Sequence, residues 1–349
     1  MFIMVYGHLF DWWLTREDRW LFTDFLKPFL GPIGATGFIF ISGLSAGLSY
    51  KKNKTFNSSL FFMKDVRNVY LFRASIILLI SFIYNFFIAI FIFNLSYIWA
   101  WFVLQTIGVS LLLAYPFLKT SRNIRFLLSI CIIIGNQLIL GLIQPYKGNA
   151  NLLGVLYHLL FHPLNQYPIL YYFPILLIGT VVGDILFDLN LINNQNERNP
   201  KFKLTFIGYL LPFGIILLLL GFFYRFPDFF VFASFSSIIF GFGEVICIFS
   251  IFMIFEEYKI FTTKKSYKYL YYFSYYSFTV YIAHNLLYFV FLKQLNVVNI
   301  WIPVIILIFL LGWILRTTYN YIGMKASLKA GISMISLVVA KKIQEQRKC

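Results

Sequence analysis

Charged residues are scarce in this sequence. Only 12% of its 349 residues are Asp, Glu, Lys or Arg, and 60% are hydrophobic, whereas soluble domains average about 25% charged residues. The longest polar interval, residues 190–203, is too short to fold as an independent unit. These features exclude a soluble globular protein and predict an integral membrane protein.

Cysteine is also rare. Cys131 and Cys247 lie in apolar stretches and Cys349 is the last residue, so nothing suggests a disulfide framework or a cysteine metal site.

The first apolar stretch lacks the basic flank and small-residue cleavage site of a signal peptide. The net charge of +16 does not indicate a nucleic-acid partner, because membrane proteins carry basic residues to orient their loops.

Long apolar segments dominate what remains. The predicted fold class is all-α, a polytopic transmembrane bundle of about ten helices in a single domain over residues 1–349, because a membrane core about 30 Å thick needs roughly 20 residues per helix. The expected spans are residues 1–14, 28–50, 71–94, 97–118, 126–145, 168–189, 204–225, 229–256, 269–292 and 299–320.

The distribution of basic residues predicts the orientation. When alternate loops are assigned to opposite sides, 23 of the 29 Lys and Arg residues fall on one side and 6 on the other. The richer side is cytoplasmic by the positive-inside rule. We therefore expect both termini in the cytoplasm and the protein in the cell membrane.

Two segments depart from ordinary spans. The first helix, residues 1–14, covers only about 21 Å at 1.5 Å per residue and is expected to be truncated. Residues 323–349 alternate apolar residues with lysines, which predicts a C-terminal cytoplasmic interfacial helix followed by a tail.

Two of the four histidines lie inside predicted spans. His8 precedes Asp11 by three residues, a spacing that puts both side chains on one helix face. A carboxylate there could orient the ring as a general base, or Asp11 could simply end the span. His284 belongs to a polar and aromatic string, residues 274–285, in the ninth span. Each histidine is either functional or a hydrogen-bonded core residue.

Other intramembrane polar groups indicate a hydrated cavity or an internal network. Glu244 lies near the centre of the eighth span. Residues 31–47 are rich in glycine and serine, which close helix packing alone could explain. The remaining intramembrane polar residues are Asn85, Gln105, Asn136 and Gln137.

A histidine pair outside the spans raises the question of a metal. His158 and His162 are four residues apart, a spacing that suits zinc, but no third ligand with matching spacing lies nearby. An interfacial helix explains the same pattern, so no metal site is predicted.

Three apolar blocks resemble the membrane acyltransferases related to heparan-α-glucosaminide N-acetyltransferase, including their prokaryotic relatives. Residues 3–8 read IMVYGH and are followed by TGFIFISGLS at 36–45. The second block is YFPILLIG at 172–179, and the third is SFTVYIAH at 277–284. The order and spacing of these blocks extend over nearly the whole chain.

This resemblance implies transfer of an acetyl group from cytosolic acetyl-CoA to an amine or hydroxyl, commonly of a sugar, on the far side of the membrane. It implies that His8 is the essential histidine and that His284 lines the same cavity. Basic residues at cytoplasmic helix ends would hold the CoA phosphates. These are Arg67, Arg73, Arg122, Arg125 and Arg316.

The sequence departs from the family pattern in one respect. An Arg-Gly pair precedes the first-helix histidine in the family, and this chain begins at Met1, too close to His8 to include it.

Two rival predictions remain. One is a transporter or flippase of a polar or lipid-linked solute, and the other is a non-catalytic membrane protein. The expected partners are the lipid bilayer and a sugar or glycan acceptor, with a homodimer left open.

Overall fold

The computed structural model describes residues 1–56, 60–161, 167–224, 234–260 and 268–346, and these residues fold almost entirely into helices. In chain order the helices are α1 (Phe2–Trp13), η1 (Leu21–Leu26), α2 (Lys27–Phe56), α3 (Leu60–Phe91), η2 (Leu95–Trp99), α4 (Val103–Phe117), α5 (Arg122–Ile143), η3 (Gln144–Tyr146), α6 (Leu152–Leu160), α7 (Ile169–Asn190), α8 (Gln195–Lys203), η4 (Leu204–Leu210), α9 (Leu211–Tyr224), α10 (Phe235–Glu257), α11 (Lys268–Tyr275), α12 (Ser277–Ala283), η6 (His284–Phe289), α13 (Trp301–Tyr321), η7 (Gly323–Ala326) and α14 (Leu328–Gln346).

The all-α polytopic fold class is confirmed. The described part of the chain contains eight helical segments long and apolar enough to cross a membrane. They correspond to eight of the ten predicted spans. The other two are shorter or broken: α1 has 12 residues, and the segment predicted at 269–292 divides into α11, α12 and the 3₁₀ helix η6.

Helices α2 and α7 form the centre of the bundle. Their crossing depends on four glycines, which lie four residues apart on each helix as Gly43 with Gly47 and Gly179 with Gly183. A Cβ atom at Gly43 would lie 2.0 Å from the carbonyl oxygen of Leu176, and the other three would meet partner carbonyl oxygens at 2.3 Å. Small residues at this spacing allow transmembrane backbones to approach closely. The same approach makes α7 almost wholly buried.

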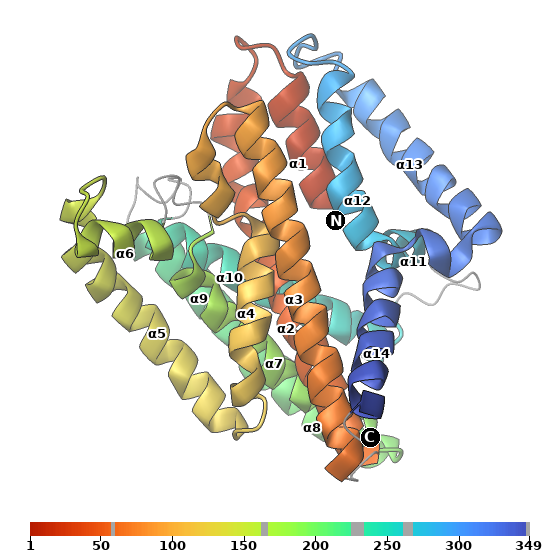
Figure 1. Cartoon of the computed structure of the whole chain (residues 1–349). Helices are drawn as coiled ribbons and strands as arrows, with labels where there is room; N and C mark the ends of the chain where they lie inside the picture. The colour runs from red at the N-terminus through yellow and green to blue at the C-terminus, as the bar shows by residue number, and fades with distance from the viewer. Residues whose placement is uncertain (57–59, 162–166, 225–233, 261–267, 347–349) are drawn as a thin grey trace.

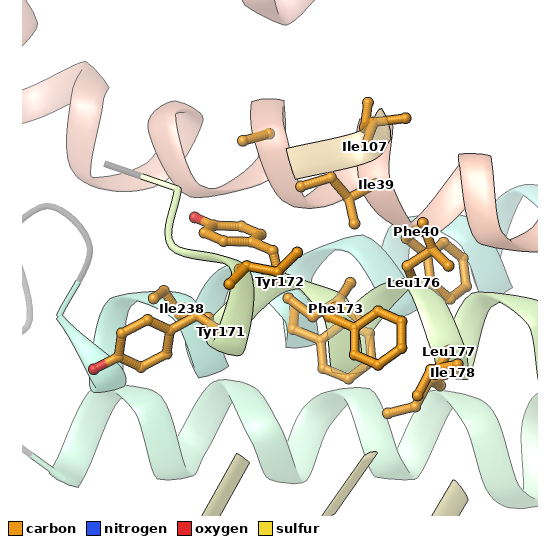
Figure 2. Packing of buried hydrophobic residues seen from close by; sticks show 14 of the residues in the cluster. Ile39, Phe40, Ile107, Tyr171, Tyr172, Phe173, Leu176, Leu177, Ile178 and Ile238 are labelled. Carbon is orange, nitrogen blue, oxygen red and sulfur yellow. The ribbon is translucent and has the colours of Figure 1, made fainter. Parts of the chain in front are cut away.

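The largest hydrophobic cluster surrounds this crossing. Figure 2 shows Ile39 and Phe40 of α2 facing Tyr172, Phe173 and Leu176 of α7, with Ile107 of α4 and Ile238 of α10 beside them. A second cluster joins α1 to α11, α12 and α13 through residues such as Leu9, Phe10, Phe273 and Val280. The short helices α1, α11 and α12 therefore pack in a region separate from the α2–α7 crossing.

The C-terminal helix α14 lies beside α3, at the end of the bundle predicted to be cytoplasmic (Figure 1). Its buried residues Ile332, Ser336 and Ala340 recur every four positions and so share one face. The helix is thus a packed element of the bundle. Its depth relative to the membrane surface stays a prediction.

Candidate active site

A cluster of aromatic rings brings the histidines of α1 and η6 together. The ring centroids of His8 and His284 are 5.0 Å apart. Trp12 stacks on His8 at 4.9 Å and on His284 at 5.7 Å. His284 is buried, whereas His8 is exposed. Two residues predicted for one site, 276 positions apart in the chain, are thus neighbours.

Backbone hydrogen bonds keep α1 and the segment after η6 in register. The Lys293 amide donates to the Trp12 carbonyl, and the Leu295 amide donates to the Trp13 carbonyl, both at 2.9 Å. The Trp13 indole also donates to the Leu287 carbonyl at 2.8 Å. These bonds give the short α1 helix a fixed partner, and they hold His8 against the helix that carries His284.

The hydrogen bond of His284 determines which ring nitrogen is free. Its Nδ1 contacts the carbonyl oxygen of Tyr281, which can only accept, so Nδ1 carries the proton in the neutral ring. Nε2 is then an acceptor; it is buried and has no hydrogen-bond partner among the described residues. Buried polar atoms are normally paired. This nitrogen is therefore poised to accept a hydrogen bond from a group that enters the site.

Asp11 has a different partner from the one that its spacing suggests. Its carboxylate accepts from Arg19 Nη2 at 2.5 Å and Nε at 3.2 Å, in the loop between α1 and η1. Both side chains reach solvent. Arg19 thus neutralises Asp11 near the C-terminal end of α1, and the His8 ring contacts Trp12 and His284.

A cavity of about 740 Å³ lies between the two hydrophobic clusters. Its walls come from the start of α1, from α2, α3, α4 and α10, and from α11, α12 and α14. Along α2 it extends from Ile33 to Ser49, which is about 24 Å at 1.5 Å per residue. The lining is mostly apolar, with Ser42, Ser45 and Ser49 along α2.

The histidine pair adjoins this cavity at Tyr281. Tyr281 lines the cavity, and its ring centroid is 5.7 Å from that of His284. Neither histidine is itself a lining residue. Tyr281 therefore lies between the cavity and His284.

The five arginines predicted to bind the cofactor have different environments. Arg73 lines the cavity. Arg67 Nε donates to Asn68 Oδ1 at 3.4 Å. The Arg67 charge is also close enough to interact electrostatically with the Tyr115 hydroxyl. Arg316 is exposed on α13, and the structure places it outside the cavity lining.

Arg122 and Arg125 instead form ion pairs with α7. The buried Arg125 contacts the Asp184 carboxylate and donates to Thr180 Oγ1 at 2.8 Å. Arg122 contacts the Asp188 carboxylate, which also accepts from Lys51 Nζ at 2.7 Å. These contacts join α2, α5 and α7.

The other intramembrane polar groups lie apart from the cavity. Asn85 donates to Gln105 Oε1 at 2.7 Å, and Gln137 donates to the Tyr171 hydroxyl at 3.0 Å. Glu244 and Asn136 each have a buried side-chain atom without a hydrogen-bond partner among the described residues. Most of these groups therefore form local networks of the bundle.

The histidine pair at positions 158 and 162 is only partly described. His158 lies near the end of α6, and His162 lies outside the described residues. Within the described ranges no three His, Cys, Asp or Glu side chains are grouped as metal ligands.

Sequence reasoning missed Trp12, Tyr281 and Lys329, which contact the histidines or line the cavity. One signal was present for the cavity itself. Ser42, Ser45 and Ser49 recur at three and four residues, so they share one face of α2. Lys329 offered no comparable signal, because it belongs to a lysine-containing segment typical of interfacial helices.

Comparison with known proteins identifies the family. Residues 1–213 match the catalytic domain of heparan-alpha-glucosaminide N-acetyltransferase. No match was found among curated proteins or among solved structures. The matched segment contains His8 and the α2–α7 crossing, whereas His284 and α14 lie beyond it. Because the match covers more than half of the chain, the protein belongs to the heparan-alpha-glucosaminide N-acetyltransferase catalytic family, a family of membrane acyltransferases.

Proposed function

We propose that the protein transfers an acetyl group from cytosolic acetyl-CoA to an amine or hydroxyl of an extracytoplasmic acceptor, a sugar or glycan. The observation that carries the proposal is the cavity, which extends from Arg73 to Tyr281 beside the histidine pair. Arg73 lies in the half of α3 predicted to be cytoplasmic, and the histidines lie towards the opposite end. This arrangement supports a donor on one side and an acceptor on the other.

The lining of the cavity suits an acyl-CoA. Its volume is within the range of about 300–1,000 Å³ typical of ligand sites. Apolar walls with serine hydroxyls along α2 match the pantetheine arm, which carries two amides. Arg73 in the cavity wall matches the phosphates at the nucleotide end of the donor.

The histidine pair supplies the groups that acyl transfer needs. An imidazole can accept the proton of the attacking amine or hydroxyl while the new bond to the thioester carbonyl forms. When the carbon–sulfur bond breaks, the same imidazolium can return the proton to the leaving thiolate. His8 is exposed and so is open to an acceptor, either as this base or as the acyl acceptor.

Purified protein tests the proposal directly. Acetyl-CoA labelled in the acetyl group should give labelled glucosamine or another sugar acceptor, and release of free CoA should match product formation. In sealed vesicles the labelled product should appear on the side opposite the donor. If solute crosses without acetylation, the protein is instead a transporter; if neither occurs with any acceptor, the enzymatic proposal fails.

A further inference from the structure

Two cations from distant parts of the sequence line the same cavity. Arg73 belongs to α3 and Lys329 to the first turn of α14, and both are among the lining residues, with Tyr70 beside them. Neither forms an ion pair within the described ranges. By contrast, Arg19, Arg122, Arg125 and Arg198 all contact carboxylates.

The placement of Lys329 follows from several contacts of α14. Ile332 is also a lining residue of the cavity, and it is buried on the face that packs beside α3. Ser327 Oγ donates to the Tyr275 carbonyl at 3.1 Å, and the Leu328 amide donates to Thr279 Oγ1 at 3.1 Å. The first turn of α14 is therefore fixed both to α3 and to the α11–α12 segment.

Like charges at this position are unfavourable without a counterion. Burial, and to a smaller extent the nearby Arg73, lower the pKa of Lys329, although this lysine keeps contact with solvent. A bound anion would offset both effects. Two cations that contact no carboxylate of the described residues, at the wall of an apolar cavity, fit a phosphate group better than they fit an empty site.

We propose that Arg73 and Lys329 together form a phosphate-binding site, so that the C-terminal helix α14 completes the cavity. The inference rests on the proposed function where it assigns the phosphate to the CoA moiety of the donor. A phospholipid headgroup presents the same chemistry, and the experiment separates the two sources. Lys329 is then a binding residue that lies outside the segment matched to the family.

The test compares Lys329→Gln and Arg73→Gln with Lys341→Gln, an exposed lysine of the same helix, as control. The probes are CoA, adenosine 3′,5′-bisphosphate and pantetheine, which lacks phosphate. Loss of one charge-assisted contact should weaken binding of the first two probes roughly ten- to hundredfold. Pantetheine binding should not change, and Lys329→Arg should retain most of the affinity for CoA.

A role in folding predicts different results. If Lys329 only stabilises α14, Lys329→Gln should lower the melting temperature of the empty protein, and pantetheine and CoA binding should fall together. A phosphate site predicts an unchanged or slightly higher melting temperature, because an unfavourable charge is removed. In turnover, KM for acetyl-CoA should rise while kcat at saturating donor is kept.

Further experiments distinguish a phospholipid headgroup from CoA as the source of the phosphate, and test the proposed function separately from the site. Protein in phosphatidylcholine nanodiscs is compared with protein in nanodiscs that contain phosphatidylglycerol, and retained lipid is measured. If Lys329→Gln releases phosphatidylglycerol but leaves CoA affinity unchanged, the donor assignment is overturned. If CoA binding depends on Lys329 but no acetyl transfer occurs, the phosphate site stands and the proposed function fails. Unchanged CoA affinity, lipid retention and KM overturn the site itself.

Discussion

The two histidines differ in what surrounds each ring. His284 is fixed by its bond to the Tyr281 carbonyl, and its Nε2 is buried without a partner among the described residues. His8 is exposed and makes ring contacts with Trp12 and His284. The buried ring is thus held in one orientation, whereas the exposed ring is accessible to a substrate. These environments favour His8 as the residue that reacts.

Substitution of His8→Ala should abolish acetyl transfer without unfolding the protein. Loss of general acid–base catalysis alone corresponds to about 10²–10⁴-fold in rate. The side chain is exposed, so its removal leaves little buried surface unfilled. The measurement is turnover with a sugar acceptor, together with thermal unfolding in the presence and absence of CoA. His158→Ala is the control; a His8→Ala protein that binds CoA and turns over within a few-fold of the parent contradicts the assignment.

The Arg125–Asp184 pair predicts a loss of stability. Arg125 is 1% exposed and its guanidinium contacts the Asp184 carboxylate. Removing one partner of a buried pair leaves the other charge unpaired and costs about 3–5 kcal/mol. Arg125→Gln should therefore lower the melting temperature strongly, whereas Arg316→Gln on the exposed face of α13 should not.

The double variant Arg125→Met with Asp184→Leu separates the ion pair from a role in binding. It removes both charges, so it should recover much of the stability that Arg125→Gln loses. If Arg125 instead contacts CoA phosphates, the double variant stays deficient in CoA binding after stability is restored.

At the residue scale, the sequence indicated candidate site residues, but it did not indicate the side chains with which they form ion pairs. His8 and His284 could be placed in one site only through the family resemblance, whose first and third blocks contain these two histidines. Asp11 was predicted to face His8 by its spacing, but its partner Arg19 lies in the following loop, whose path depends on tertiary packing. Likewise, Arg125 was predicted to bind the CoA phosphates, and its carboxylate partner Asp184 lies 59 residues away in the sequence.

Among the helices, α2 and α7 show how glycine content allows close helix packing. Close helix packing was one of two explanations for the glycine-rich residues 31–47, and Gly43 and Gly47 do meet the backbone of α7. The matching pair, Gly179 and Gly183, lies at the same spacing on the partner. What the sequence could not indicate is which helix would be that partner, because glycines elsewhere, such as Gly141, face open space.

Substitution of Gly183→Ala should therefore destabilise the bundle. A Cβ atom there would lie 2.3 Å from the Leu44 carbonyl oxygen, and neither backbone can move without shifting the helix. Overpacking of this kind costs about 1–3 kcal/mol. The measurement is the melting temperature of detergent-solubilised protein. Gly141→Ala, with nothing within 4 Å, is the matched control; equal stability of the two variants would contradict the packing argument.

The α11–η6 segment was harder to predict than the central helices. Residues 269–292 are apolar and long enough for one span, but the helix breaks at Tyr276 and tightens into a 3₁₀ helix at His284. The hydroxyl of Tyr276 donates to the Gly323 carbonyl at 2.7 Å, so the break is linked to a partner far along the chain. The hydrophobicity of a segment indicates how long a membrane-spanning helix could be, but it carries no information on the tertiary contacts that accompany a break in that helix.

For the whole molecule, the charge distribution predicts the orientation in the membrane, and the proposed use of the cavity depends on it. The end of the bundle that contains Lys51, Arg122 and Arg198 is basic, and ion pairs join its helices there. The histidine pair lies towards the other end, where α1 and η6 meet. If the basic end is cytoplasmic, a cytosolic donor enters beside Arg73 and the acceptor meets His8 from outside. The proposed reaction therefore depends on the orientation.

Cysteine labelling in intact cells tests this orientation. In a background without Cys131, Cys247 and Cys349, Lys52→Cys is placed at the basic end of α2 and Ala150→Cys in the loop between η3 and α6. Both positions are exposed, so differences in labelling report the side of the membrane. A membrane-impermeant maleimide should label Ala150→Cys in intact cells and Lys52→Cys only after permeabilisation. The reverse pattern overturns the topology and, with it, the entry of a cytosolic donor beside Arg73.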